Sequence, residues 1–298
     1  MRVIKTLDEL AEARRGWEQS GQVGFVPTMG YLHMGHLRLV QSARAENDVT
    51  VVSIFVNPTQ FGPNEDLSRY PRDLPHDLEE LEYHGVDAVF TPEASAIYPP
   101  GFATYVEPTG TLAERLEAAT RPGHFRGVAT VVAKLFMLVR PERAYFGQKD
   151  AQQVAVIRRL ISDLNIPVAL CVRPTVREAD GLAMSSRNAY LNAEQRVAAT
   201  VLSKALEAGR VAFDRLRAES KLGAVETVRQ AMVDMIASEP AATLDYADIC
   251  HPDTFAPLES LEAPALLAIA AKVGPARLID NYLLRADGSW DVGERLKA

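Results

Sequence analysis

The sequence predicts an α/β protein: a doubly wound parallel sheet, followed by a smaller α+β domain with a short antiparallel sheet. Up to about residue 175, short apolar runs alternate with longer helical patterns, which is typical of a parallel sheet covered on both faces. After Pro174 the order changes to two helical segments followed by three β-like runs. A length of 298 residues suits about two domains. We therefore place the domains at residues 1–175 and 176–298.

The strands of the first domain are predicted from short apolar runs, at Val23–Val26, Thr50–Val56 (which is rich in β-branched residues), Ala88–Phe90, Ala144–Phe146 and Val168–Val172. Helices are predicted between them over His36–Asn47, Asp73–His84, Val128–Val139 and Asp150–Leu164. Gly85 and Pro141 mark two of the helix ends. This alternation makes the first domain Rossmann-like. In such sheets ligands bind at the carboxyl ends of the strands, so we expect the functional residues just after strands.

The second domain begins with helical patterns and ends with strands. Asn192 can cap a helix that runs to about Arg217, because Gln195 stands in capping-box position. A second helix is predicted from about Lys221 to Ser238. Prolines then separate three strand-like runs, at Leu244–Cys250, Leu266–Val273 and Arg277–Leu284.

Composition excludes several classes of function. The formal net charge of −7 argues against general nucleic-acid binding, which needs a basic face. We find neither a signal peptide nor an apolar run of about 18 residues that could span a membrane. Cys171 and Cys250 lie in apolar stretches and are interpreted as buried thiols of a reducing compartment. A cytoplasmic protein is expected, with no nucleic-acid or membrane partner.

Two histidines, His33 and His36, follow the first predicted strand in a glycine-bearing turn that opens a helix. A helix N-terminus has unpaired backbone N–H groups and partial positive charge, so it favours phosphate. Two imidazoles there can stabilise charge that builds up on phosphate oxygens. The alternative is a pair of surface histidines in a turn. The agreement of strand, glycines and helix start favours the phosphate site.

Asn57 and Gln60 follow the second predicted strand and offer both donors and acceptors, which suits a small substrate bearing hydroxyl or carboxylate groups. A polar turn imposed by Pro58 and Gly62 is the alternative. A second glycine-rich turn at residues 121–127 carries Arg121, His124 and Arg126; an anion site and a simple helix-entry loop explain it equally well.

Two later segments offer further phosphate-binding groups. Gly147 lets the backbone approach a ligand, and Lys149 can neutralise phosphate as a point charge. Asp150 can cap the following helix, or bind a ribose hydroxyl or a metal-bound water, and Gln153 lies one turn further on. In the second segment, Ser185, Ser186 and Arg187 combine two hydroxyls with a guanidinium fork that matches phosphate oxygens. A polar loop between the domains is the alternative there.

Six stretches together resemble one family. They are P-T-M-G-x-L-H-x-G-H at 27–36, S-I-F-V-N-P-x-Q-F at 53–61, Y-P-R at 70–72, G-H-F-x-G-V at 123–128, F-G-x-K-D-x-Q-Q at 146–153 and D-G-L-A-M-S-S-R-N at 180–188. The chain resembles the pantothenate synthetase (pantoate–β-alanine ligase) family of the HIGH-motif nucleotidyltransferase superfamily. The H-x-G-H run alone is only moderately specific, but the full set in this order is very specific.

The resemblance implies an ATP-dependent ligase. Pantoate would attack the α-phosphorus of ATP with Mg²⁺ to give pantoyl adenylate and pyrophosphate, and β-alanine would then release AMP and pantothenate. The second domain would act as a lid, and a homodimer is expected. His36 (as proton donor), His33 and Lys149 would be catalytic. Gln60, Gln153 and Asn57 would bind pantoate or β-alanine, and no protein metal ligand is expected. ATP would be bound by Met29, Gly30, His33, Gly35, His36, Gly147, Gln148, Lys149, Asp150, Val176, Met184, Ser185, Ser186 and Arg187.

Gln148 departs from the family pattern, in which glutamate is usual, so any metal role of that side chain is in doubt. Two other functions remain open. One is a nucleotidyltransferase that leaves AMP or CMP on its product, and the other is a non-catalytic nucleotide-binding module. Loss of the histidines or of Lys149 would favour the latter, and both are present.

Overall fold

The computed structural model describes residues 1–17, 19–63 and 65–296, and the chain divides into two compact units. The first contains residues 1–147 and 153–173. The second contains the short segment Gln148–Gln152 and the chain from Pro174 onward. In the described part of the chain, we find no helix with the length and apolarity needed to cross a bilayer.

The first unit is built on a six-stranded sheet in the order β1-β4-β3-β2-β5-β6, with every neighbouring pair parallel. Because β3 and β5 flank β2, the strand order reverses between β2 and β5, which is the type of position where open α/β sheets bind ligands. The strands are β1 (Arg2–Ile4), β2 (Val23–Thr28), β3 (Val49–Ile54), β4 (Ala88–Phe90), β5 (Arg143–Gly147) and β6 (Ala169–Arg173).

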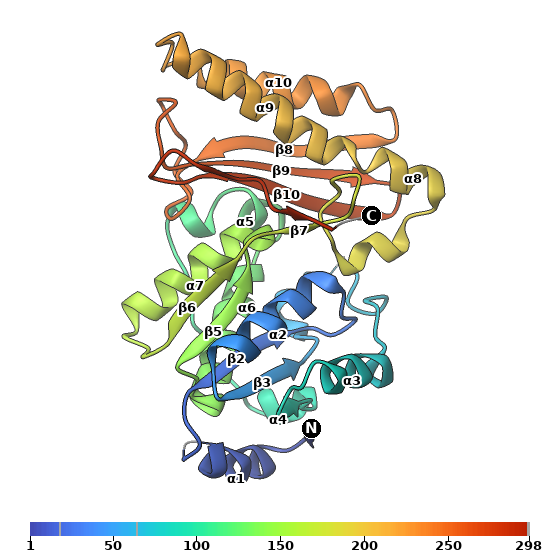
Figure 1. Ribbon diagram of the computed structural model, residues 1–298, viewed down its shortest axis with the longest axis vertical. Helices are drawn as coiled ribbons and strands as arrows, with labels where there is room; N and C mark the ends of the chain where they lie inside the picture. The colour runs from blue at the N-terminus through green and yellow to red at the C-terminus, as the bar shows by residue number, and fades with distance from the viewer. Residues whose placement is uncertain (18, 64, 297–298) are drawn as a thin grey trace. The chain divides into compact units, whose positions relative to one another are not determined.

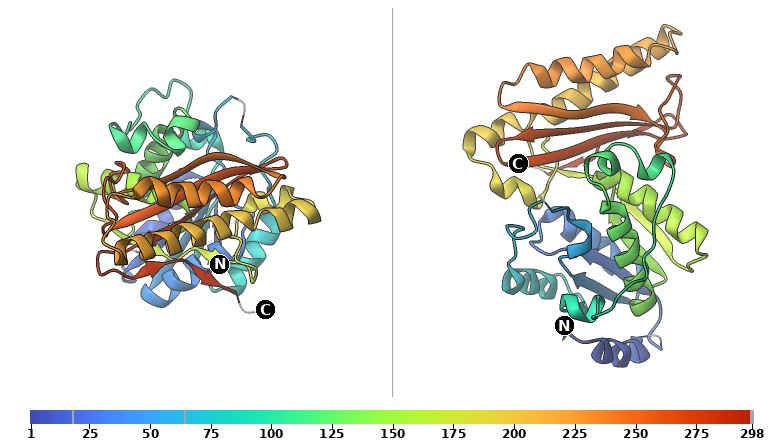
Figure 2. Two further views of the ribbon diagram at one scale, coloured as in Figure 1. Left: turned by 90° about the horizontal axis from the view of Figure 1, so that it is seen from above. Right: turned by 180° about the vertical axis from the view of Figure 1, so that it is seen from behind.

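Helices cover both faces of this sheet. Helix α2 packs on β2, β3 and β5, and α6 lies on the opposite face, where it packs on β2 (Figures 1 and 2). The central strands are buried along nearly their whole length, as expected for a sheet covered on both sides. The helical segments are α1 (Leu7–Trp17), α2 (Met34–Glu46), η1 (Pro58–Gln60), α3 (Leu74–Tyr83), α4 (Ala94–Ile97), η2 (Thr111–Ala113), α5 (Glu117–Thr120), α6 (His124–Val139) and α7 (Ala151–Asp163).

The second unit has an antiparallel sheet in the order β11-β10-β9-β8, with α9 and α10 side by side on one face (Figure 1). A separate parallel pair joins β7 to β12. Its elements are η3 (Gln148–Asp150), β7 (Val176–Arg177), η4 (Ser186–Tyr190), α8 (Ala193–Ala198), α9 (Val201–Ala218), α10 (Val225–Ala237), β8 (Ala242–Cys250), β9 (Ala265–Val273), β10 (Ala276–Leu284), β11 (Trp290–Asp291) and β12 (Glu294–Arg295). The two sheets confirm the fold class predicted from the sequence.

Several local predictions are corrected. The helix expected from Asn192 to about Arg217 is two helices, because the chain turns at Ala199–Thr200. There the Thr200 N–H donates to the carbonyl three residues back, at Val197, and not to the carbonyl four residues back as in an α-helix. Helix α6 begins at His124, one turn before the predicted start, with Gly123 at φ 83° as its N-cap. Cys171 is only partly buried, whereas Cys250 is buried as predicted.

Candidate active site

The histidine turn connects β2 to α2. His33 is the N-cap of α2: its Nδ1 accepts a hydrogen bond from Gly35 N–H (3.1 Å), while Nδ1 of His36 accepts from His33 N–H (3.3 Å). The two ring centroids lie 4.1 Å apart. Because each Nδ1 acts as an acceptor, each neutral ring carries its hydrogen on Nε2. The turn therefore gives two imidazole N–H donors at the positive end of a 13-residue helix.

Asp77 of α3 supports this turn from the side, and no sequence pattern indicated this role. Its carboxylate accepts hydrogen bonds from Tyr31 N–H (2.8 Å) and Leu32 N–H (2.7 Å), and the residue is only 1% exposed. Burial raises the pKa of Asp77, while the two backbone donors act in the opposite direction. The turn also requires positive φ at Gly30 (80°) and Tyr31 (50°). The sequence has no local signal for this contact, since Asp77 lies 45 residues beyond Leu32.

Asn57 and Gln60 lie together at the start and end of η1, after β3. The Asn57 Nδ2 group donates to Gln60 Oε1 (3.0 Å) and to Gly127 O (3.2 Å), and its Oδ1 accepts from Tyr98 OH (2.8 Å). Both side chains are buried. These contacts give Asn57 a role in holding Gln60; the predicted contact of Asn57 with substrate stays a prediction.

Gln60 is also connected to the ATP-binding residues predicted on the histidine turn. Its Nε2 lies 3.1 Å from the sulfur of Met29, the residue directly after β2. The first unit therefore brings together predicted nucleotide-binding and substrate-binding residues. Gln153 is half-buried in the first turn of α7.

A buried polar network lies behind Gln60. His124 Nδ1 lies 2.8 Å from Gln60 O, and His124 Nε2 lies 3.1 Å from Nη1 of Arg121. A carbonyl can only accept, so His124 carries its hydrogen on Nδ1, and its Nε2 accepts from Arg121. Burial, followed by the charge of Arg121, lowers the pKa of His124 to about 4. The ring is therefore neutral at pH 7.

Arg121 completes this network through an ion pair. Its guanidinium donates twice to Glu65, with both nitrogen–oxygen distances at 2.8 Å. Burial alone would raise the pKa of Glu65, but the hydrogen bonds and charge of Arg121 hold it below its ordinary value. The second glycine-rich turn, for which the sequence left two explanations open, thus supports the backbone of Gln60.

Gly147 is the last residue of β5 in the first unit, and the remaining predicted residues belong to the second unit. Gln148 is buried, and Lys149 Nζ lies 3.6 Å from Asp150 Oδ1, whose side chain is about half exposed. Met184 N–H donates to the carbonyl of Val176 in β7 (2.9 Å). Ser185 caps η4, with its Oγ accepting from Arg187 N–H (3.3 Å). Ser186 is buried and Arg187 is half-buried.

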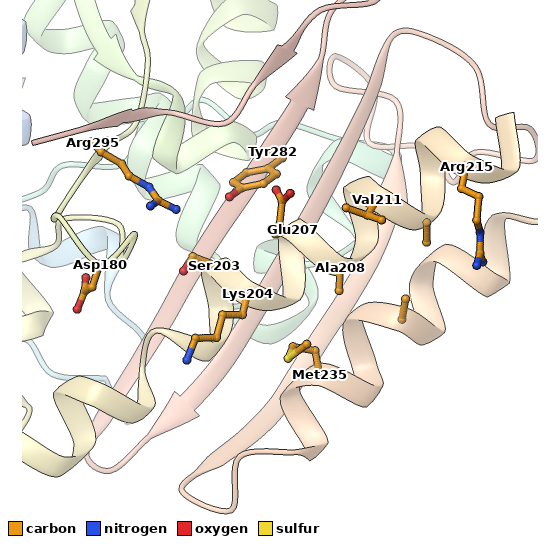
Figure 3. A pocket seen from close by; sticks show the side chains of 12 residues that line it. Asp180, Ser203, Lys204, Glu207, Ala208, Val211, Arg215, Met235, Tyr282 and Arg295 are labelled. Carbon is orange, nitrogen blue, oxygen red and sulfur yellow. The ribbon is translucent and has the colours of Figure 1, made fainter. Parts of the chain in front are cut away.

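The described residues bring no three His, Cys, Asp or Glu side chains close enough to hold a metal ion. Asp150 is the carboxylate that pairs with the predicted phosphate-binding lysine. The second unit also has an open pocket of about 720 Å³ between α9, α10 and β10, and none of the predicted site residues lines it. Tyr282 and Glu207 face one another in it, and Arg295 lies beside them (Figure 3).

The family model, the similar sequences and the similar solved structures all indicate the same family. The model of the pantoate-beta-alanine ligase family matches residues 2–283. A pantothenate synthetase of Herpetosiphon aurantiacus is 53% identical over 95% of this chain and 100% of its own, and one of Roseiflexus castenholzii is 56% identical over 96% and 100%. The crystal structure of pantothenate synthetase from Thermus thermophilus is similar, with a TM-score of 0.87, 50% identity and coverage of 94% and 98%. A pantoate-beta-alanine ligase from Francisella tularensis, complexed with beta-gamma ATP and beta-alanine, has a TM-score of 0.76, 34% identity and coverage of 95% and 97%.

Proposed function

Since the chain belongs to the pantoate-beta-alanine ligase family, we propose that it joins pantoate to β-alanine in two steps, through a pantoyl adenylate. A carboxylate oxygen of (R)-pantoate attacks the α-phosphorus of ATP, and the bond from that phosphorus to the bridging oxygen breaks. Pyrophosphate leaves with the electron pair. The amine of β-alanine then attacks the acyl carbon, the carbon–oxygen bond to AMP breaks, and the nitrogen loses its proton to water.

The histidine turn is the observation that carries this proposal. In the first step negative charge builds up on the departing phosphate oxygens. The Nε2–H groups of His33 and His36 are suitable donors for it, because the capping hydrogen bonds hold both rings in one tautomer. Preorganised donors of this kind stabilise the transition state without reorganising during the reaction. We assign the transferable proton to His36.

Lys149 and the Ser185–Arg187 segment supply the other groups for ATP. The lysine side chain is mostly buried and pairs with Asp150, and Arg187 presents a guanidinium beside two hydroxyls. The ligands of the Francisella tularensis relative support ATP and β-alanine as substrates. Gln60 and Gln153 would bind pantoate through their amide groups.

Mg²⁺ is proposed to enter with ATP. Magnesium keeps most of its waters and often takes only one or two carboxylates, and the half-exposed Asp150 beside Lys149 fits contact with such a water. When bound, the ion would neutralise charge on the phosphates. We also propose that the protein is a cytoplasmic homodimer and that residues 176–298 act as a lid; sedimentation and cell fractionation test the first two properties.

Isotope exchange tests the two-step route. Purified protein with ATP, Mg²⁺ and pantoate is expected to exchange labelled pyrophosphate into ATP without β-alanine, and to release AMP once β-alanine is added. Exchange that requires β-alanine would contradict a free-standing adenylate. A product that keeps the AMP group would instead indicate the alternative nucleotidyltransferase.

A further inference from the structure

Two consecutive buried polar residues, Asp280 and Asn281, lie in the middle of strand β10. Both are less than 5% exposed. Burial of polar groups is costly unless they are hydrogen-bonded, so their partners show what they do. Each side chain is bonded to a different segment of the second unit, and both segments carry predicted ATP-binding residues.

Asn281 is bonded to the turn that carries Lys149. Its Nδ2 group donates to the carbonyls of Gln148 (3.1 Å) and Lys149 (2.9 Å), which uses both amide hydrogens. Its Oδ1 lies 3.3 Å from Nε2 of Gln148, which is the donor. Two of these hydrogen bonds therefore hold the backbone of η3 directly at the lysine, and the third holds the side chain of Gln148.

Gln148 matches this arrangement chemically. Its amide can donate to Asn281 Oδ1, whereas a carboxylate at the same place would set one acceptor against another. Glutamine, which replaces the usual glutamate at position 148, thus donates a hydrogen bond to Asn281 that a carboxylate could not donate.

Asp280 fixes the second segment through Arg177. The guanidinium donates twice to the carboxylate, at 2.6 and 2.8 Å, and once to Gly181 O at 3.0 Å. Gly181 opens the loop that leads to Met184–Arg187. Truncating Asp280 would leave a buried arginine without its ion-pair partner, which is strongly destabilising. Asn281 is therefore the better residue to test, because its truncation leaves the buried ion pair of Arg177 with Asp280 in place.

We propose that Asn281 is a positioning residue for ATP, which acts by fixing the main chain from which Lys149 extends. This inference rests on the proposed function, in which Lys149 binds a phosphate. A displacement of about 1 Å at a reacting group can cost 100-fold in rate. We therefore expect Asn281→Ala to lower kcat/KM for ATP by about 10–100-fold in pyrophosphate exchange. In the complete ligation reaction, KM for β-alanine should be unchanged.

A double-mutant cycle separates this role from a merely structural one. If Asn281 acts through Lys149, Asn281→Ala lowers exchange by less than about twofold in the Lys149→Ala background. Equal losses in both backgrounds would overturn the proposal. The matched control is Leu278→Ala on the same strand, a buried residue of the second unit's apolar core. It is expected to lower the melting temperature and leave KM for ATP unchanged, and a raised KM there would equally overturn the proposal.

Gln148→Glu gives an independent measurement. It removes the donor to Asn281 and places a carboxylate near Oδ1, so it should reproduce part of the loss seen in Asn281→Ala. No change in KM for ATP would contradict the proposed match between residues 148 and 281. Should Lys149→Ala itself have no effect, the proposed function fails at that residue, whatever Asn281 does.

Discussion

The carboxylate of Asp77 lies 2.8 Å from the backbone nitrogen of Tyr31, a residue held at φ 50° in the histidine turn. The same carboxylate accepts from Leu32 N–H. An acidic residue on α3 thus holds the segment that sets the positions of His33 and His36. Asp77 supports the turn and is not proposed to touch a substrate, yet its loss should change the rate of adenylation.

Asp77→Ala should slow the adenylation step and lower stability together. It removes the acceptor of the buried Leu32 N–H and of the partly buried Tyr31 N–H, and hydrogen bonds to a charged group contribute about 1.5–3 kcal/mol. Urea unfolding and pyrophosphate exchange measure the two effects. Asp73→Ala is the control, because Asp73 caps the same helix through His76 N–H, and its described side-chain hydrogen bond does not reach the turn. Equal losses of exchange in both variants would refute the role of Asp77.

Gly30→Ala tests the shape of the turn. Gly30 has φ 80°, and an added Cβ would lie 2.9 Å from Asp77 Oδ2 and 2.9 Å from Ile54 Cγ2. Gly101 has a nearly identical φ of 83° with open space around its Cβ position. The left-handed conformation should cost either alanine variant about 1–2 kcal/mol. Only Gly30→Ala should add the cost of the close contacts and lose pyrophosphate exchange; equal unfolding free energies would show that the turn accommodates the methyl group.

The order of apolar runs along the chain was sufficient to predict five of the six strands of the parallel sheet, because buried strands of this kind are continuous Val-, Ile- and Phe-rich segments. The edge strand β1 was missed, because it has only three residues. The break between α8 and α9 was missed because neither glycine nor proline marks it. Ala199 and Thr200 keep dihedral angles near those of a helix. Local pattern therefore gave no reason to divide the segment.

The residues that bear predicted chemistry follow strands and could be found by motif and position. Those that support them could not. Asp77 reaches Leu32 across 45 residues, and Asn281 reaches Lys149 across 132. A hydrogen bond over such a separation leaves no periodicity in the sequence. The departure of Gln148 from glutamate was visible in the sequence, but it put only a metal role in doubt and did not indicate the bond to Asn281.

The neutral His124 should make stability depend on pH. Its pKa is lowered to about 4 in the folded protein, against an ordinary value of about 6.5, so between these values the unfolded chain binds more protons. The free energy of unfolding should therefore fall as the pH drops from 7 to 4, by at most about 3 kcal/mol from this residue. Below about pH 4 this contribution should level off, because the folded protein also takes up the proton.

Urea unfolding of wild type and His124→Asn over pH 4–7 measures this effect. Asparagine can keep a donor toward Gln60 O near the position of Nδ1, but it does not titrate. The variant should show a smaller loss of stability over that range than wild type. Identical pH profiles would mean that His124 does not contribute to the acid sensitivity.

His36 has two roles that one substitution can separate. Its Nδ1 completes the capping box of α2 by accepting from His33 N–H, and its Nε2–H is the proposed donor to phosphate. His36→Asn keeps an acceptor near the position of Nδ1 and removes Nε2, whereas His36→Ala removes both. Both variants should slow pyrophosphate exchange by about 10²–10³, the scale for losing one preorganised donor. Only His36→Ala should also lose about 1 kcal/mol of stability from the cap. Near-normal exchange in His36→Asn would show that the ring serves the helix and not the reaction.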